Sequence, residues 1–192
     1  MTSETDAIRV DFLPADLLPP SSRLGMTIAP GKQNYGMQAI WKRDLHTDLR
    51  HLRDAYQVDR LVTLLEKDEM AQLSIPTLLT DAEAYGMRTR WLPIPDFHTP
   101  TSMQGLFELV QDILTWLQQQ QTVVVHCKGG LGRSGLVAAS CLTAMGHSPD
   151  EAFAYVRHAR PGSVETTGQE AYVVAFAHHL RQGDFVFNEA LR

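Results

Sequence analysis

One short segment of the sequence combines a thiol, an arginine and several glycines. It reads His126-Cys127-Lys128-Gly129-Gly130-Leu131-Gly132-Arg133-Ser134-Gly135. A glycine-rich turn that leads into a helix aims several backbone N–H groups at one point, above the positive end of the helix dipole. A cysteine at the start of that turn has its thiolate stabilised by the same dipole and amides, which makes it nucleophilic near neutral pH. The segment is therefore predicted to bind an anion beside a nucleophilic sulfur.

Two more side chains of this segment suit phosphate chemistry. Arg133 can donate two parallel hydrogen bonds to two phosphate oxygens. Ser134 can donate a hydrogen bond to the sulfur of Cys127, which helps the sulfur to leave when a phosphocysteine is hydrolysed. The predicted phosphate cradle consists of Lys128, Gly129, Gly130, Leu131, Gly132 and Arg133.

The elements that flank this segment place the cysteine at the end of a strand. Residues 122–126, Thr-Val-Val-Val-His, form a β-branched run that is typical of a central parallel strand covered on both faces. Residues 133–145 are predicted as the helix that follows. Two more helices are expected, one capped at residues 148–151 and the other over residues 171–180.

Upstream, strand-like and helix-like segments alternate. Strands are predicted at residues 24–28, 61–65 and 89–94, and helices at 48–56, 70–85 (interrupted by Pro76) and 102–119. This alternation predicts an α/β fold with a central, mostly parallel sheet of about four or five strands flanked by helices. We expect a single catalytic domain over residues 1–192, with a lead-in segment at 1–22 and a tail at 182–192.

Composition excludes several classes of protein. With 192 residues, 44% hydrophobic and 20% charged, the chain can bury a core. The net charge of −5 argues against a general nucleic-acid binder. The charge-free stretch at residues 136–148 is too short to span a bilayer, and no metal-ligand spacing is present among the histidines. Two cysteines and a polar N-terminus without a secretory pattern lead us to expect a reducing, cytoplasmic environment.

The pattern His126-Cys127, five residues, then Arg133-Ser134 resembles the signature of the cysteine-dependent protein tyrosine and dual-specificity phosphatases. The kinase-associated members are the most similar, because residues 22–27, Pro30-Gly31 and the Gly-Gly-Leu-Gly run at 129–132 also look alike. The resemblance covers about residues 17–181. It implies a phosphatase-type fold and hydrolysis of phosphotyrosine and phosphoserine/phosphothreonine in proteins through a phosphocysteine, without a cofactor. A kinase partner is raised by the resemblance alone.

The family also needs a general acid upstream of the cysteine. Asp96, which follows Pro95 in a proline-flanked loop, resembles that acid; it can protonate the leaving oxygen and then take a proton from the attacking water. Gln169 resembles a family glutamine that positions this water. Alternatively, Asp96 is only a turn-forming residue. Weaker candidates for the acid are Asp44, Asp81 and Asp112.

Other interpretations remain open at this point. Residues 130–135 also match the dinucleotide fingerprint G-x-G-x-x-G, although helices follow where that fold needs a second strand. Cys127 is alternatively a buried structural thiol. His126 is expected to orient the loop rather than act as a base, and Cys141 is expected to lie in the core.

The substrate class depends on the charges of the cradle. Lys128 adds one cation, as in tensin-like lipid phosphatases, but Leu131 stands where those enzymes have a second lysine. We therefore favour phosphoprotein over phosphoinositide as substrate. A phosphoinositide phosphatase, a non-catalytic phosphate-binding module and a sulfur- or arsenate-handling enzyme are the alternatives.

Overall fold

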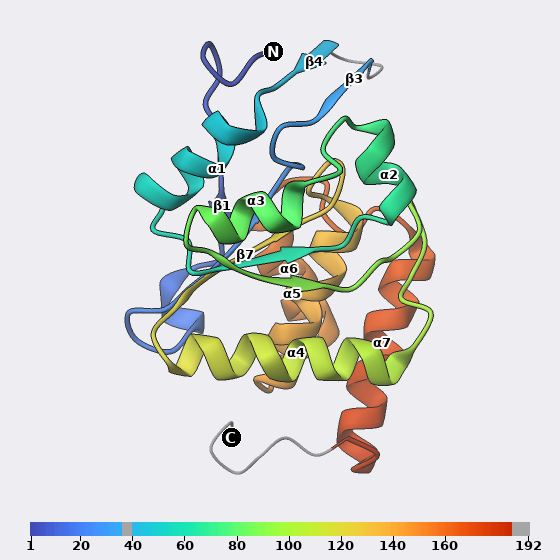
Figure 1. Cartoon of the computed structure of the whole chain (residues 1–192). Helices are drawn as coiled ribbons and strands as arrows, with labels where there is room; N and C mark the ends of the chain where they lie inside the picture. The colour runs from blue at the N-terminus through green and yellow to red at the C-terminus, as the bar shows by residue number, and fades with distance from the viewer. Residues whose placement is uncertain (36–39, 186–192) are drawn as a thin grey trace.

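A five-stranded sheet forms the centre of the molecule. The computed structural model describes residues 1–35 and 40–185 (Figure 1). The sheet order is β1-β2-β7-β5-β6, in which β1 is antiparallel to β2 and the other pairs are parallel. The strands are β1 (Asp11–Phe12), β2 (Arg23–Thr27), β5 (Arg60–Thr63), β6 (Arg88–Trp91) and β7 (Thr122–His126). The predicted α/β fold with a mostly parallel central sheet is confirmed.

Helices cover both faces of this sheet. On one face, α1 (Leu45–Asp54) and α3 (Leu78–Ala84) bury their apolar residues. On the other face lie α4 (Met103–Gln118) and α5 (Gly132–Ala144), with α6 (Pro149–Ala159) and α7 (Thr167–Gln182) packed against α5 (Figure 1). The short helix α2 (Lys67–Gln72) follows β5.

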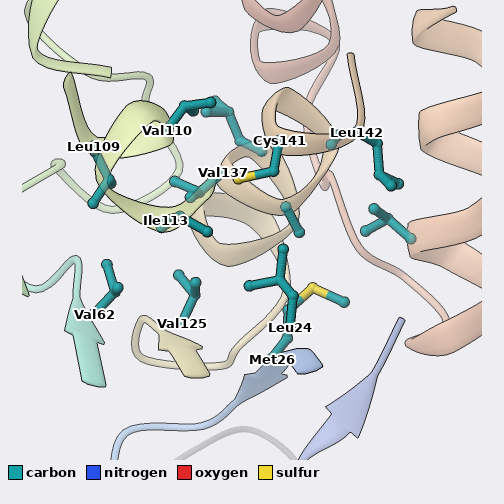
Figure 2. Close-up of a cluster of buried hydrophobic side chains, with 14 of the residues drawn as sticks. Leu24, Met26, Val62, Leu109, Val110, Ile113, Val125, Val137, Cys141 and Leu142 are labelled. Carbon is teal, nitrogen blue, oxygen red and sulfur yellow. The ribbon is translucent and has the colours of Figure 1, made fainter. Parts of the chain in front are cut away.

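The side chains of β7 (Thr122–His126) show why its three central positions are all valine. Val123 and Val125 face the core shared with α4 and α5, whereas Val124 faces the core shared with α1 and α3. Figure 2 shows Val125 and Val62 of the sheet facing Ile113 of α4 and Val137 of α5. A strand between two cores needs no polar face.

The carboxyl ends of the parallel strands meet at one edge. In the sheet register, His126 at the end of β7 lies between Thr27 of β2 and Thr63 of β5. The loops after β2, β5, β6 and β7 therefore emerge side by side. In open parallel sheets this edge is where ligands bind.

The N-terminal segment contributes more than a lead-in. Its residues Asp11 and Phe12 pair with β2 as an antiparallel edge strand, and Ile8 and Leu13 are buried in the two cores. A two-residue strand leaves no period in the sequence, so pattern analysis missed it. A second sheet, made of β3 (Gln33–Tyr35) and β4 (Ile40–Lys42), was also missed, because each of its strands is three residues long.

Most of the predicted elements are present with shifted bounds. The predicted helix at 70–85 is two helices, α2 and α3, on either side of Pro76. The strand predicted at 89–94 ends at Trp91, before Pro93. Residues 186–192 of the predicted tail lie outside the described residues, and α7 ends at Gln182, followed by Gly183 in a left-handed conformation. No helix in the described part of the chain is long and apolar enough to cross a membrane.

Candidate active site

Cys127 lies at the point where β7 ends and the glycine-rich loop begins. Its side chain is 3% exposed, and the backbone N–H of Gly130 donates a hydrogen bond to its Sγ at 3.2 Å. Gly130 has a φ of +70°, and a Cβ there would lie 2.3 Å from the carbonyl oxygen of Thr27. Only glycine therefore lets the loop pack against β2 and turn its amide toward the sulfur.

Arg133, in the first turn of α5, has its guanidinium fixed by groups from α2 and from the loop after β6. Nη1 and Nη2 donate to the two carboxylate oxygens of Glu69 at 2.6 and 3.0 Å, and Nη1 also donates to the carbonyl of Ile94 at 2.8 Å. The side chain is only 1% exposed. The guanidinium plane is thus preset before it meets any ligand.

Burial alone would lower the pKa of Arg133, but its hydrogen bonds to Glu69 and the charges of Cys127, Glu69 and Asp96 raise it. Arg133 therefore stays cationic. Sequence analysis missed Glu69, because a separation of 64 residues gives no local pattern. Its carboxylate is fixed locally, since the backbone N–H of Glu66 donates to Glu69 Oε2 at 3.0 Å in the capping box of α2.

Asp96 lies in the loop after β6 and reaches the same guanidinium. Arg133 Nη2 donates to Asp96 Oδ1 at 2.8 Å, and Lys128 Nζ lies 3.8 Å from Oδ2. The structure therefore brings together three of the predicted residues, Asp96, Lys128 and Arg133. The weaker acid candidates have local partners of their own: Asp44 caps α1, Asp81 binds Thr77 and Asp112 pairs with Arg90.

His126 is buried between the sheet and the loop. Its Nε2 is 2.9 Å from Thr63 Oγ1, and its Nδ1 is 3.4 Å from the carbonyl of Cys127. Burial lowers the pKa of His126 to about 4, against the raising effect of the Cys127 carbonyl. A ring with so low a pKa is a weak base near pH 7, which favours the predicted orienting role over that of a base.

Ser134 and Gln169 adopt arrangements that sequence alone did not anticipate. Ser134 Oγ is buried and has no hydrogen-bond partner among the described residues, so the predicted bond to Cys127 Sγ is not formed here. A buried unpaired hydroxyl is uncommon and points to a role in binding or chemistry. Gln169 accepts from the backbone N–H of Glu165 and donates to the carbonyl of His98, which ties α7 to the Asp96 loop.

The second cysteine does not join this site. Cys141 is fully buried in the core between α4, α5 and the sheet (Figure 2), and burial raises the pKa of its thiol. Within residues 1–35 and 40–185, no group of three or more His, Cys, Asp or Glu side chains is arranged to hold a metal ion.

The chain matches known phosphatases over most of its length. A family model described as a polymorphic toxin system DSP-PTPase phosphatase matches residues 35–147. Cyclin-dependent kinase inhibitor 3 of Rattus norvegicus is 30% identical over 180 residues, which span 92% of this chain and 82% of the relative.

Two solved structures extend the comparison. A crystal structure of kinase associated phosphatase (KAP), with its catalytic-site cysteine replaced by serine, superposes with a TM-score of 0.80 at 26% identity, covering 93% of this chain and 96% of that one. Tk-PTP in its active form gives a TM-score of 0.66 at 30% identity, covering 81% and 91%. The predicted resemblance to the kinase-associated phosphatases is confirmed.

Proposed function

This chain belongs to the dual-specificity and protein tyrosine phosphatase family, and from that premise we propose that it hydrolyses phosphotyrosine and phosphoserine/phosphothreonine in proteins through a phosphocysteine at Cys127. The observation that carries the proposal is the convergence on one sulfur: the Gly130 amide at 3.2 Å, the start of α5, and Arg133 held in place beside Asp96. A nucleophile and an anion cradle from the loop after β7 meet an acid from the loop after β6 at the carboxyl edge of the sheet.

In the first step the thiolate of Cys127 attacks phosphorus, and the bond from phosphorus to the leaving oxygen breaks. The amides of the cradle and the guanidinium of Arg133 stabilise the charge on the three remaining oxygens. Asp96 donates its proton to the leaving oxygen. The products are the free hydroxyl group of the protein side chain and a phosphocysteine.

In the second step water attacks the phosphocysteine and the S–P bond breaks. Asp96 accepts a proton from the water, so it ends the cycle protonated, as it began. Ser134 Oγ, buried and unpaired among the described residues, is suited to donate to the sulfur as it leaves. Gln169 already binds the carbonyl of His98 in the Asp96 loop at 3.2 Å, and we propose that it helps to place the water.

The contact between Arg133 and Asp96 couples binding to acid catalysis. Arg133 Nη2 donates to Asp96 Oδ1. A phosphate that accepts two parallel hydrogen bonds from the guanidinium competes with Asp96 for this donor. Protonation of Asp96 removes its negative charge and weakens the ion pair. When Asp96 is protonated, it can therefore act as an acid, and it also leaves Arg133 free to bind phosphate.

Replacing Asp96 with asparagine is expected to lower kcat without raising KM. The variant has no proton to donate, so alkyl phosphates, which have poor leaving groups, should lose on the order of 10²- to 10⁴-fold in kcat/KM, and activated aryl phosphates much less. The ion pair that competes with phosphate is also lost, so KM should stay level or fall. Steady-state kinetics on one alkyl and one aryl phosphate measure both effects.

Asp112→Asn is the matched control, because Asp112 also pairs with an arginine but lies on α4. This variant should have the wild-type kcat and KM on both substrates. Equal losses in kcat/KM on alkyl and aryl phosphates for Asp96→Asn would assign the acid to another residue.

Protein rather than lipid is the proposed substrate, because the cradle has one cation, Lys128, besides the buried Arg133. Lys128 is half exposed and already lies near Asp96, while Leu131 adds no charge. The names of the rat relative and of KAP refer to a kinase, which supports phosphoprotein substrates and, on those names alone, a kinase partner. A thiolate nucleophile must stay reduced, which fits the proposed cytoplasmic location.

A panel of phosphotyrosine peptides, phosphothreonine peptides and phosphoinositides tests the substrate class. We expect the wild type to hydrolyse both peptide types with a kcat/KM at least about tenfold above that for any inositol lipid. Leu131→Lys should shift the ratio toward the lipids. A wild type that prefers phosphoinositides tenfold would replace the proposal with the lipid alternative.

A further inference from the structure

Two carbonyl groups of the cradle loop are held by cations that come from outside the loop. Lys32 Nζ donates to the carbonyl of Lys128 at 3.1 Å, and this oxygen also accepts from the backbone N–H of Ala29 at 3.4 Å. Arg160 Nη2 donates to the carbonyl of Gly129 at 3.0 Å. The loop that holds the sulfur is therefore anchored to the loop after β2 and to the end of α6.

These contacts set the direction in which the loop amides point. In a trans peptide the C=O and the N–H of the next residue point in opposite directions. Holding the carbonyl of Gly129 outward turns the N–H of Gly130 inward, and this N–H does donate to Cys127 Sγ at 3.2 Å. By the same geometry, Lys32 turns the N–H of Gly129 inward.

Lys32 is a buried cation in contact with the cradle loop. It is 4% exposed, and its Nζ lies 3.9 Å from the centre of the Trp41 ring. Burial lowers the pKa of Lys32 to about 8; the charge of Cys127 raises it, while the cations Arg43, Lys128 and Arg160 lower it further. Among the charged groups that act on Lys32, the Cys127 thiolate is the one that stabilises its ammonium.

The position of Lys32 is fixed by a buried ion pair. The backbone N–H of Gly31 donates to Asp48 Oδ2 at 2.8 Å, and Asp48 receives two hydrogen bonds from Arg43 at 2.7 and 2.8 Å. Both side chains of this pair are 1% exposed. Arg43 also donates its backbone N–H to the carbonyl of Lys32 at 3.2 Å.

We propose that Lys32 is a positioning residue of the phosphatase reaction: with Arg160 it orients the peptide units of residues 128–130 toward the sulfur and the bound phosphate, and its ammonium stabilises the Cys127 thiolate. The proposal rests on the proposed function. It assigns a task to a buried lysine that lies 95 residues before the cysteine in sequence and next to the cradle in space.

The first test follows the reactivity of the thiol rather than turnover. Cys127 in the wild type and in Lys32→Met is alkylated with iodoacetamide from pH 5 to 9, and the peptide that contains Cys127 is quantified by mass spectrometry. Loss of a charged hydrogen bond and of the cation should slow alkylation at pH 6 by about tenfold or more and move the profile to higher pH. Lys42→Met, on exposed β4, is the matched control and should follow the wild type.

The second test uses tungstate as a phosphate analogue that needs no proton from Asp96. As pH rises through about 8, Lys32 loses its proton, so tungstate affinity of the wild type should fall there. Lys32→Arg keeps its charge at this pH and should bind tungstate with a flatter profile. Lys32→Met should bind tungstate about tenfold more weakly at pH 7, and its tungstate affinity should not fall as the pH passes 8.

The outcomes separate the two proposals. Matching alkylation profiles for Lys32→Met and the wild type would overturn the role of Lys32, whether or not the wild type hydrolyses phosphate esters. If the alkylation profile of Lys32→Met is shifted from that of the wild type but the wild type shows no turnover, the role of Lys32 at the sulfur is supported and the phosphatase function is overturned. If Lys32→Met does not fold, as judged by circular dichroism, Lys32→Gln is measured in its place and the same outcomes apply.

Discussion

Replacing Cys127 with serine should lower the turnover of an aryl phosphate by more than about 10⁴-fold. A serine hydroxyl is not ionised near neutral pH, whereas a thiolate at this position accepts the Gly130 N–H and interacts electrostatically with Arg133 and Lys32. The measurement is steady-state turnover in excess chelator, with circular dichroism to show that the variant is folded. A phosphocysteine route needs no divalent ion, so the wild type should keep its full rate in chelator.

Cys141→Ala is the matched control for the loss of a thiol. Cys141 is buried in the core between the sheet and α5, so the variant should lose some stability but keep its turnover per folded molecule. Rapid quenching of the wild type should trap a phosphoryl group on the peptide that contains Cys127. A Cys127→Ser protein that works at the wild-type rate, or a wild type revived only by added metal, would rule out this mechanism.

Local patterns in the sequence predicted the central part of the fold. The β-branched run at residues 122–126 matches β7 residue for residue, because burial on both faces favours valine at all three central positions. The capping box at Ser148 correctly marks the start of α6. By contrast, β1, β3 and β4 depend on partners far along the chain, and each is too short to show a period.

The same distinction applies to the candidate site. Cys127, Arg133 and the cradle are contiguous, so one segment displays their chemistry. Glu69 and Lys32 reach the site only through the sheet register, which places the loops after β5 and β2 beside the loop after β7. A buried arginine implies an anionic partner, but the sequence does not say which of the 22 acidic residues supplies it.

Replacing Arg133 with lysine should lower kcat/KM by on the order of 10³-fold. The guanidinium holds three carbonyl or carboxylate partners in one plane: Glu69 through two parallel bonds, Ile94 and Asp96. A lysine ammonium can replace the charge but not the plane, so it cannot bind Glu69 with one edge and two phosphate oxygens with another. Kinetics with an aryl phosphate should show the loss mainly in kcat, since the transition state carries more charge on these oxygens than the bound substrate.

Arg90→Lys is the matched control, because Arg90 also bonds a carboxylate, that of Asp112, but lies on β6 at the surface. Surface ion pairs contribute little, so this variant should retain wild-type kinetics. Glu69→Gln gives an intermediate case. Arg133 keeps its charge and can still donate to the amide oxygen of the glutamine, but it loses the carboxylate that fixes its guanidinium. If planar fixation of the guanidinium matters, Glu69→Gln should fall between the wild type and Arg133→Lys in kcat. A lysine variant within about threefold of the wild type would show that charge alone suffices at this position.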